Sequence, residues 1–441
     1  MPGAQVTVPA DHPRLALVVT GDITNPGGVE SSTQRIARSL SRHTPFAVDL
    51  IMLRPDLGRS YDQDFYADPD APAAIHHGVR RYELRALSTS AFPAERAFHA
   101  HLGLVDLLRR NRYHLVHGLY ASTAGFHATY AALEVGIPAV VGLRGNDIHA
   151  DVFHSSRFAH LRWALEHATS VTAVSSEALR RADLLTGCGP RGRVILNSID
   201  PAAYLPGTIR HSEGSPVIGS LAKFRGKKAA QTLIAAFARL AEDHPRARLV
   251  LVGGIGGDAQ SDVLDAVTAS DLGSRVVLTG PIDRTEAVAH IRGMDVFVHA
   301  AIHDGSPNAV LEAMLAGTPV VATAVGAIPE MVVDGREAVL VSPAGSPSAL
   351  YEGIVAALVA DRAALTSAAT EALRTRFAPE REITELVEVY EACTGTVKPC
   401  VSASSSPPPI STSATPSPPG ISPNGSAKAA TPWSGEDRTS A

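Results

Sequence analysis

Short apolar runs alternate with amphipathic segments along most of this chain. The runs RLALVVTG (14–21), FAVDLIML (46–53) and PVVATAVG (319–326) have the length and aliphatic content of buried strands. Segments such as AAQTLIAAFARLAEDH (229–244) carry apolar residues at helical spacing between such runs. Because consecutive parallel strands are joined through helices, the alternation predicts an α/β fold built on parallel sheets.

Two changes of composition divide the chain. Residues 201–215 replace the alternation with Pro, Gly and polar residues, which predicts an interdomain linker. From residue 395 the sequence is rich in Ser and Pro and cannot bury enough apolar surface to offset the entropy of ordering. We therefore expect α/β domains at 12–200 and 216–376, a helix at 377–394 and a disordered tail at 395–441.

Charge and cysteine content exclude several classes of function. Lys and Arg total 39 against 44 Asp and Glu, a net charge of −5, which gives no support for nucleic-acid binding. The three cysteines, Cys188, Cys393 and Cys400, are too few and too widely spaced for a disulfide framework or a zinc site. Since the sequence shows no signal-peptide pattern and no apolar run near the ~18 residues of a membrane helix, we expect a soluble, cytoplasmic protein without a transmembrane segment.

The segment HDGSPNAVLEAMLAGTPVVA (303–322) has the signature of a helix that begins directly after a loop. Ser306 is a favoured N-cap residue, Pro307 suits the first helical position, and Gly317 ends the helix. The strand MDVFVHA precedes the loop, so the helix start lies at the carboxyl end of a strand, where parallel sheets bind ligands. Free backbone N–H groups and the helix dipole predict a phosphate site there, formed by Asn308, Ala309 and Val310.

Two acids lie on either side of this helix start. Glu312 can reach ribose hydroxyls while phosphates sit at the helix start, and Asp304 can meet the hydroxyls of a transferred group. Taken singly, each acid is better explained without a ligand, Glu312 as a solvated helix residue and Asp304 as a turn residue. Their combination around one helix start favours a binding site.

Four cations lie between a strand and a helix in SLAKFRGKKAAQTL (220–233). In an acidic chain, Lys223, Arg225, Lys227 and Lys228 predict a diphosphate partner held by charge-assisted hydrogen bonds, although a solvated basic loop is the alternative. Gly27 and Gly28, and Gly254 in GGIGGD (253–258), allow close backbone approach to a ligand but also fit tight turns.

The order of GGVE, RGNDI, AVSSEAL, NSID, DGSPNAVLEAMLAGTPVVAT and VGAIPEMVVDG resembles the retaining glycosyltransferases of family four, over roughly residues 14–392. The resemblance implies a GT-B fold, in which two Rossmann-like α/β domains face a central cleft. The first domain would bind the acceptor and the second the nucleotide sugar, and the helix at 377–394 would pack back toward the first domain.

The resemblance also implies roles for individual residues. Glu312 would bind the ribose and Lys228 the diphosphate, while the Gly27–Gly28 loop and the segment from Arg144 to Asp147 would close over the cleft. The implied catalytic residues are Lys228, Asp304 and Asp147. The implied donor-binding residues are Gly28, Lys223, Arg225, Lys228, Gly254, Asp304, Gly305, Ser306, Pro307, Asn308, Ala309, Val310 and Glu312. The acceptor side would comprise Gly27, His117, Arg144 and Asn146.

Several positions depart from the family pattern. Asp304 stands where the family usually has Glu, Ser220 replaces an Arg that contacts phosphate, and Arg144 replaces a His. The family's Lys-Gly pair is Lys228-Ala229 here, with two extra residues before it, and its NGVD is NSID (197–200). The pairs DQD (62–64) and DPD (68–70) match the metal motif of the other main glycosyltransferase fold, but no apolar strand precedes them, and we interpret them as loop acids.

The implied activity is retaining transfer of a sugar from a UDP- or GDP-linked donor to a hydroxyl of a small molecule, glycan or lipid-linked acceptor. The resemblance implies no cofactor and no metal, since lysine, arginine and a helix end would carry the diphosphate charge. Two alternatives remain: a GT-B epimerase or hydrolase that transfers nothing to an acceptor, and a degenerate protein that only binds a sugar nucleotide.

Overall fold

The computed structural model describes residues 13–20, 28–54, 74–76, 78–85, 93–204, 206–211, 215–224, 229–256 and 259–395. Both sheets belong to one compact unit, Met1–Val397. The remaining residues, with the predicted tail, lie outside the described ranges, as do the DQD and DPD pairs and the cations Arg225, Lys227 and Lys228.

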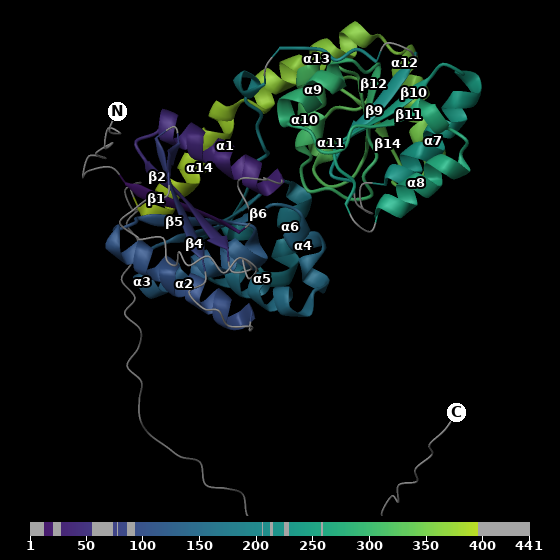
Figure 1. Cartoon of the computed structure of the whole chain (residues 1–441). Coiled ribbons are helices and arrows are strands. Elements are labelled where there is room, and N and C mark those ends of the chain that lie inside the picture. The colour runs from purple at the N-terminus through teal and green to yellow at the C-terminus, as the bar shows by residue number, and fades with distance from the viewer. Residues whose placement is uncertain are drawn as a thin grey trace, which may run out of the picture. The chain divides into compact units, whose positions relative to one another are not determined.

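The first sheet has the order β3-β4-β2-β1-β5-β6-β7-β8, and its neighbours are parallel except for the antiparallel pair β3–β4 (Figure 1). The chain leaves β1 toward β2 on one side and returns to pair β5 on the other, so the strand order reverses between β1 and β5. We call this sheet with its helices the first lobe. Its strands are β1 (Arg14–Thr20), β2 (Ala47–Arg54), β3 (Ala74–His76), β4 (Val79–Arg85), β5 (Leu115–Leu119), β6 (Ala139–Leu143), β7 (Ser170–Ala173) and β8 (Gly192–Val194).

Helices cover the first sheet, and short helical turns connect them. The helices are α1 (Gly28–His43), α2 (Pro93–Arg110), α3 (Phe126–Val135), α4 (Asn146–His149), α5 (Ser155–His167) and α6 (Ser176–Thr186). The turns are a π-helix, η1 (Ala121–Gly125), and the 3₁₀ turns η2 (Asp151–Phe153), η3 (Gly189–Arg191) and η4 (Pro201–Ala203).

The second sheet is fully parallel, with the order β11-β10-β9-β12-β13-β14. This doubly wound order reverses between β9 and β12, and in such sheets ligands bind outside the carboxyl ends of the two central strands. We call this sheet with its helices the second lobe. Its strands are β9 (Val217–Leu221), β10 (Arg248–Val252), β11 (Val276–Leu278), β12 (Val296–His299), β13 (Val320–Thr323) and β14 (Val339–Val341).

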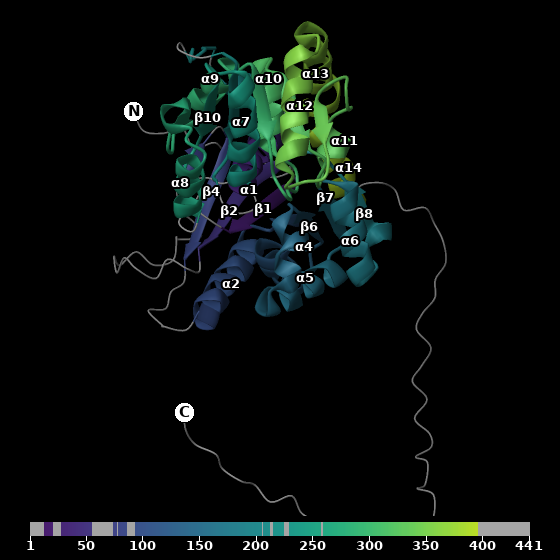
Figure 2. The same ribbon diagram turned by 90° about the vertical axis from the view of Figure 1, so that its right-hand side faces the viewer.

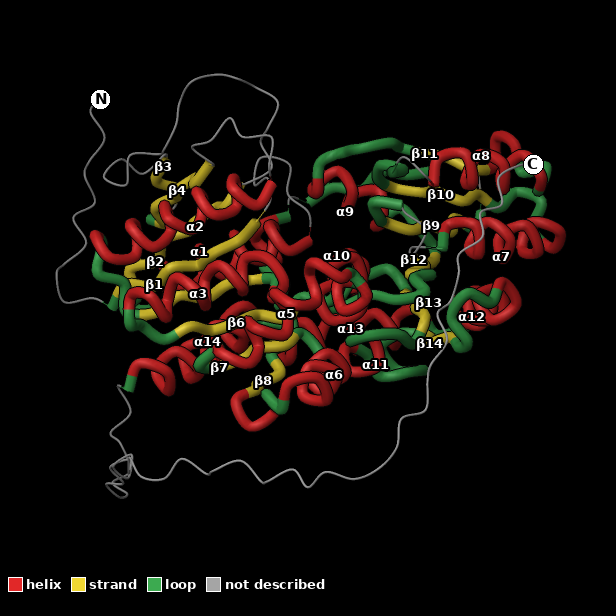
Figure 3. The backbone as a smooth tube through the Cα atoms, turned by 90° about the horizontal axis from the view of Figure 1, so that it is seen from below, coloured by secondary structure: helices red, strands yellow, loops and turns green. Residues whose placement is uncertain are grey.

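Helices also surround the second sheet, so that the strands of both sheets lie inside and the helices outside (Figure 3). The apolar clusters on the two faces of the second sheet contain residues such as Phe297 and Phe237, both fully buried. The helices are α7 (Ala230–Asp243), α8 (Ala259–Ala269), α9 (Arg284–Arg292), α10 (Asn308–Ala316), α11 (Ile328–Met331), α12 (Pro347–Val359) and α13 (Arg362–Arg376), with the 3₁₀ turn η6 (Gly273–Arg275).

The last helix, α14 (Pro379–Thr394), packs on the first lobe although it follows the second in sequence (Figures 1 and 2). Ile383, Leu386 and Tyr390 belong to the apolar cluster that contains Leu15 of β1 and Leu40 of α1. The first lobe therefore takes part of its core from the C-terminal end of the described chain.

Candidate functional site

The loops that follow β9 and β12 converge at the point where the second sheet reverses its strand order. Lys223 lies exposed in the loop after β9, and the segment from Asp304 to Pro307 follows β12. The Phe224 N–H donates to the carbonyl of Gly254 (2.9 Å), which joins the loop after β9 to the loop after β10. Phe224 therefore lies beside Gly254, and β9 pairs with β12, the strand that leads toward α10.

Helix α10 begins one residue later than predicted. Pro307, with extended φ/ψ of −74° and 111°, is the N-cap residue, and Asn308 is the first helical residue. Ser306 does not cap the helix, because its hydroxyl points to the sulfur of Met331 (3.8 Å). The Val310 N–H donates to the Pro307 carbonyl (3.1 Å), so it is not available to a phosphate in this conformation. The predicted end is confirmed at Gly317, whose φ is +69°.

Glu312 is buried, with 3% of its surface exposed, and its carboxylate has two partners from distant segments. The Tyr204 hydroxyl donates to Oε1 (3.0 Å), and Arg284 Nε donates to the same oxygen. Burial, and then the adjacent carboxylate, raises the pKa of Tyr204, which keeps its hydroxyl protonated as a donor. The sequence prediction named neither Tyr204 nor Arg284.

Asp304 lies where the two lobes meet. His299 Nε2 is 3.1 Å from Asp304 Oδ2, so the last residue of β12 orients this carboxylate. The next residue, Gly305, approaches Gly145 of the first lobe so closely that a Cβ on Gly305 would lie 2.6 Å from the Gly145 Cα. The side chain of Asp304 is 13% exposed, which leaves part of it accessible at this junction.

Asp147, which was predicted to be catalytic, is buried and holds the backbone of its own loop in place. Its carboxylate accepts the backbone N–H groups of Ala121 (3.2 Å), Arg144 (2.9 Å), Gly145 (2.8 Å) and Ile148 (3.1 Å). Burial raises the pKa of Asp147, and these hydrogen bonds partly offset the rise. Because Asp147 has no exposed surface, the prediction that it touches a reacting group is wrong for this conformation, and it positions the Arg144–Ile148 loop instead.

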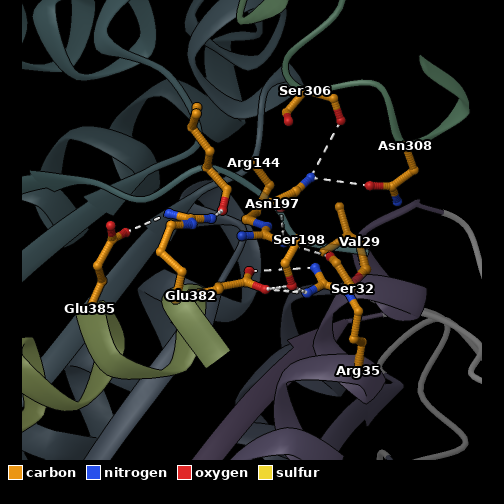
Figure 4. Close-up of polar contacts among 12 residues, drawn as sticks. Val29, Ser32, Arg35, Arg144, Asn197, Ser198, Ser306, Asn308, Glu382 and Glu385 are labelled. Atoms are coloured by element: carbon orange, nitrogen blue, oxygen red, sulfur yellow. Dashed lines mark hydrogen bonds and ion pairs between the residues drawn. The ribbon is translucent and has the colours of Figure 1, made fainter. Parts of the chain in front are cut away.

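Arg144 connects this loop to the start of α10 through Asn197 (Figure 4). Its Nη2 donates to the Ser32 hydroxyl (2.5 Å) and to Asn197 Oδ1 (3.1 Å). The Asn197 amide then donates to the Ser306 carbonyl (3.4 Å) and to Asn308 Oδ1 (3.3 Å). Burial lowers the pKa of Arg144 to about 10, which still leaves the guanidinium charged at neutral pH.

Behind Arg144, a buried ion pair joins α1 to α14. Arg35 donates to Glu382 and to the Ser198 hydroxyl, and Ser198 itself donates to Glu382 Oε2 (2.6 Å) (Figure 4). Burial opposes ionisation of Glu382, but Arg35 and Ser198 outweigh it and lower the pKa of this carboxyl. The pair holds the last helix against the segment that leads into the second lobe.

His117 was predicted to lie on the acceptor side, and the structure places it in the core of the first lobe. It is 1% exposed, its Nδ1 is 2.8 Å from the Tyr390 hydroxyl, and its Nε2 is 3.4 Å from Thr172 Oγ1. Burial, with a contribution from Arg144, lowers the pKa of His117 to about 3. A neutral, enclosed imidazole cannot line an acceptor surface here, so that prediction is corrected.

Tyr120 is a further feature of the first lobe that sequence reasoning missed. It follows β5 at the reversal of strand order, and its φ of +96° is rare for a residue other than glycine. The π-helix η1 comes directly after it, and both strained φ values and π-helical turns occur often at functional sites. The predicted acceptor-side residue Asn146 lies partly exposed in α4, Gly28 is the exposed first residue of α1, and Gly27 lies outside the described residues.

A second contact between the lobes involves Glu330 of α11. Its carboxylate accepts the Ser176 N–H (2.9 and 3.0 Å) and the Ser176 hydroxyl (2.9 Å). Ser176 is the first residue of α6, so a carboxylate of the second lobe sits at the positive end of a first-lobe helix.

In the described part of the chain, no group of three His, Cys, Asp or Glu side chains is arranged to hold a metal ion. Within the same ranges, no single helix combines the length and apolarity needed to cross a membrane. One pair of helical segments, Pro347–Val359 and Arg362–Thr394, passes that test when taken together across a sharp bend, by length and composition only.

Two protein families match this chain, one over the first lobe and one over the second. The family described as Glycosyltransferase Family 4 matches residues 26–203, and the one described as Glycosyl transferases group 1 matches residues 215–360. Together the two matches include Arg144, Asp304 and Glu312, whereas Tyr204 and the residues of α14 lie outside them.

Individual relatives agree with these matches. The chain is 28% identical to a 2-deoxystreptamine glucosyltransferase from Streptomyces kanamyceticus over 52% of its own length and 63% of the relative's, which is less than two thirds of that protein. It is 25% identical to a GDP-mannose-dependent alpha-mannosyltransferase from Mycolicibacterium smegmatis over 87% of its length and 98% of the relative's. In fold it is similar to the sucrose-phosphate synthase of Thermosynechococcus elongatus, with a TM-score of 0.69, 22% identity and coverage of 87% and 100%.

Proposed function

Because the chain belongs to the group 1 glycosyltransferases of family four and has their GT-B fold, we propose that it transfers a hexosyl group from a nucleoside diphosphate sugar to an acceptor hydroxyl with retention of configuration. The observation that carries the proposal is the reversal point between β9 and β12. Lys223 follows β9 there, and the segment after β12 leads into α10, which carries the buried Glu312.

We propose UDP or GDP as the nucleotide of the donor. The relative from Mycolicibacterium smegmatis is named for its dependence on GDP-mannose, and the one from Streptomyces kanamyceticus is named a glucosyltransferase. In this proposal Glu312 accepts hydrogen bonds from the ribose hydroxyls, and Tyr204 and Arg284 hold the carboxylate in place. Asp304, oriented by His299, meets hydroxyls of the donor sugar.

The proposed chemistry places the main electrostatic demand on the leaving group. The bond between the anomeric carbon and the donor phosphate breaks, and its electron pair stays on the phosphate. The acceptor oxygen bonds to the same face of that carbon, and its proton passes to the departing phosphate oxygen. Lys228, with Arg225, Lys223 and the amino end of α10, would stabilise the diphosphate, without a divalent metal or a cofactor.

On the acceptor side, the proposal assigns positioning to the first lobe. The Gly27–Gly28 loop and Tyr120 follow β1 and β5, the two strands between which the order reverses, so an acceptor bound there would face the second lobe. Arg144 and Asn197 would hold that surface in a fixed position relative to the start of α10. Asn146 lies in the same loop as Arg144 and completes the proposed surface.

A release assay tests this function. The purified chain is incubated with UDP- and GDP-linked sugars, with and without candidate acceptors and with or without EDTA, and free nucleotide is measured. Transfer gives acceptor-dependent release that EDTA leaves unchanged. Release without an acceptor indicates a hydrolase, and nucleotide binding without turnover in every condition rules out the enzymatic proposal.

Two variants test the site itself. Glu312→Ala and Lys228→Ala should each lower kcat/KM at least about tenfold, the scale of one charge-assisted hydrogen bond. Glu371→Ala, at a carboxylate 58% exposed on α13, is the matched control and should keep wild-type kinetics. Wild-type kinetics in both site variants would show that the donor is bound elsewhere.

A further inference from the structure

A polar cavity of about 560 Å³ lies between α1, the segment from Ser198 to Tyr204, and the starts of α9 and α10. Its volume is within the range of small-molecule sites, about 300–1,000 Å³. Arg35, Arg38 and Arg42 from α1 and Arg284 from α9 line it. The cavity therefore has walls from both lobes and an unusual number of guanidinium groups.

The three arginines of α1 follow from the pattern of that helix. Residues 35, 38 and 42 are spaced at i, i+3 and i+7 and share one face, whereas Ile36 and Leu40 are buried in the core of the first lobe. An amphipathic helix usually turns such a polar face to solvent. Here the polar face forms one wall of the cavity, which Ser31 and Ser39 also line.

The positive charge of the cavity is only partly balanced. Arg35 pairs with Glu382, and Arg284 pairs with Glu312. Across the described ranges, Arg38 and Arg42 form no ion pair, and Arg38 Nη2 is 3.3 Å from the amide oxygen of Gln34. Among the described residues that line the cavity, the one acid is Asp200, whose carboxylate accepts the Ala202 N–H (3.0 Å).

We propose that the α1 wall of this cavity binds the phosphate group of a small phosphorylated molecule, whereas Asn308, which also lines the cavity, belongs to the proposed donor site. Guanidinium groups bind phosphate through paired, charge-assisted hydrogen bonds, and Arg38 and Arg42 are the two that no carboxylate occupies among the described residues. The serine hydroxyls of α1 supply neutral donors beside them. The phosphate can belong to the acceptor or to a free metabolite, and both sources present the same chemistry.

The cavity is also linked to the donor site. Arg284 lines the cavity and at the same time donates to Glu312, the residue that the proposed function assigns to the ribose. An anion at Arg284 competes with Glu312 for the same guanidinium. Occupation of the cavity therefore changes the affinity for the nucleotide, and by linkage the nucleotide changes the affinity for the phosphorylated molecule by the same factor.

Calorimetric titration of the full chain with inorganic phosphate and with glucose 6-phosphate tests the proposal, in the absence and in the presence of saturating UDP or GDP. Binding should persist with nucleotide present. Arg38→Gln and Arg42→Gln should each weaken it about tenfold, the scale of one charge-assisted bond. The matched control is Arg180→Gln, at an exposed arginine of α6 outside the cavity, which should bind as wild type.

The two sources are distinguished by using glucose 6-phosphate in the release assay. A phosphorylated acceptor gives a sugar-linked product by mass spectrometry that glucose does not give, whereas a free effector gives no product but shifts nucleotide affinity. Complete loss of binding at saturating nucleotide, or wild-type affinity in Arg38→Gln and Arg42→Gln, overturns the proposal. If the glutamine variants do not fold, Arg38→Lys and Arg42→Lys replace them in the binding measurement, because they keep the charge but lose the paired hydrogen bonds of the guanidinium. Nucleotide binding measured alone tests the donor site separately.

Discussion

Gly145 of the first lobe and Gly305 of the second touch backbone to backbone. A Cβ on Gly305 would lie 2.6 Å from the Gly145 Cα and 2.9 Å from the Arg144 carbonyl, and real Cβ atoms do not come this close to backbone. Gly145 also has a φ of +125°, which disfavours any side chain. The pair therefore allows the loop that Asp147 organises to meet the loop that carries Asp304.

Gly305→Ala should keep the lobes from closing at this contact. The methyl group meets backbone that cannot move aside like a flexible side chain, so we expect kcat/KM to fall at least about tenfold with a small change in Tm, measured by the release assay and by thermal unfolding. Gly187→Ala is the control: its methyl group meets open space, and because the φ of +66° strains an alanine, the variant should lower the Tm but keep kcat/KM. Equal kinetics for Gly305→Ala and wild type would contradict the need for this approach.

The contact between Ser176 and Glu330 should be measurable as a coupling energy. Ser176→Ala, Glu330→Gln and the double variant form a cycle, and the lost hydroxyl–carboxylate bond predicts a coupling of about 0.5–1.5 kcal/mol in urea unfolding. Additive effects of the two substitutions would mean that the lobes do not hold this contact in solution.

Asp147→Asn distinguishes a positioning role from direct chemistry. An asparagine offers an NH₂ group to backbone N–H donors that now face a carboxylate, so we expect the free energy of unfolding to fall by about 1–3 kcal/mol. Nucleotide affinity, measured by calorimetry, should stay at the wild-type value because Asp147 lies in the first lobe, away from Glu312. A variant of full stability but no turnover would instead restore the catalytic assignment.

The buried His117 should make stability depend on pH. Its folded pKa of about 3 lies below the unfolded value of 6.5, so the unfolded chain binds more protons between these values and stability falls as the pH drops through that window. The loss is at most about 1.4 kcal/mol per pH unit. His117→Gln should flatten the dependence relative to wild type in urea unfolding at pH 7, 6 and 5. Parallel curves for the two proteins would show that His117 is solvated in the native state.

The sequence predicted the elements whose pattern is local. The apolar runs at 14–21 and 46–53 became β1 and β2, and the end of α10 at Gly317 was correct because a left-handed glycine marks it. Glu312 was recognised from its place in the motif. Its partners Tyr204 and Arg284 are 108 and 28 residues away in sequence, and no local pattern relates residues at such distances.

The differences between the sequence predictions and the structure come from contacts that residue type alone does not reveal. His117 lies in the middle of β5 and Asp147 lies in α4 after β6; their residue type indicates a site, but α14 encloses the first and backbone N–H groups surround the carboxylate of the second. The start of α10 was misplaced because Ser306 is a favoured cap by composition, but its hydroxyl meets Met331 of α11 instead. The sequence analysis did not predict a role for the arginines of α1, because the opposite wall of their cavity comes from the second lobe, far away in the sequence.

The packing of α14 on the first lobe also bears on how the protein is made. Tyr390 and Glu382 complete the core beside β1, β5 and α1, yet the ribosome adds them only after the whole second lobe has been synthesised. The first lobe emerges without its last helix, whereas the second lobe is a continuous segment that can fold as soon as it leaves the exit tunnel. In chain order the second lobe lies between two segments of the first, and separating the two would require residues 379–394 to be joined directly to the N-terminal segment.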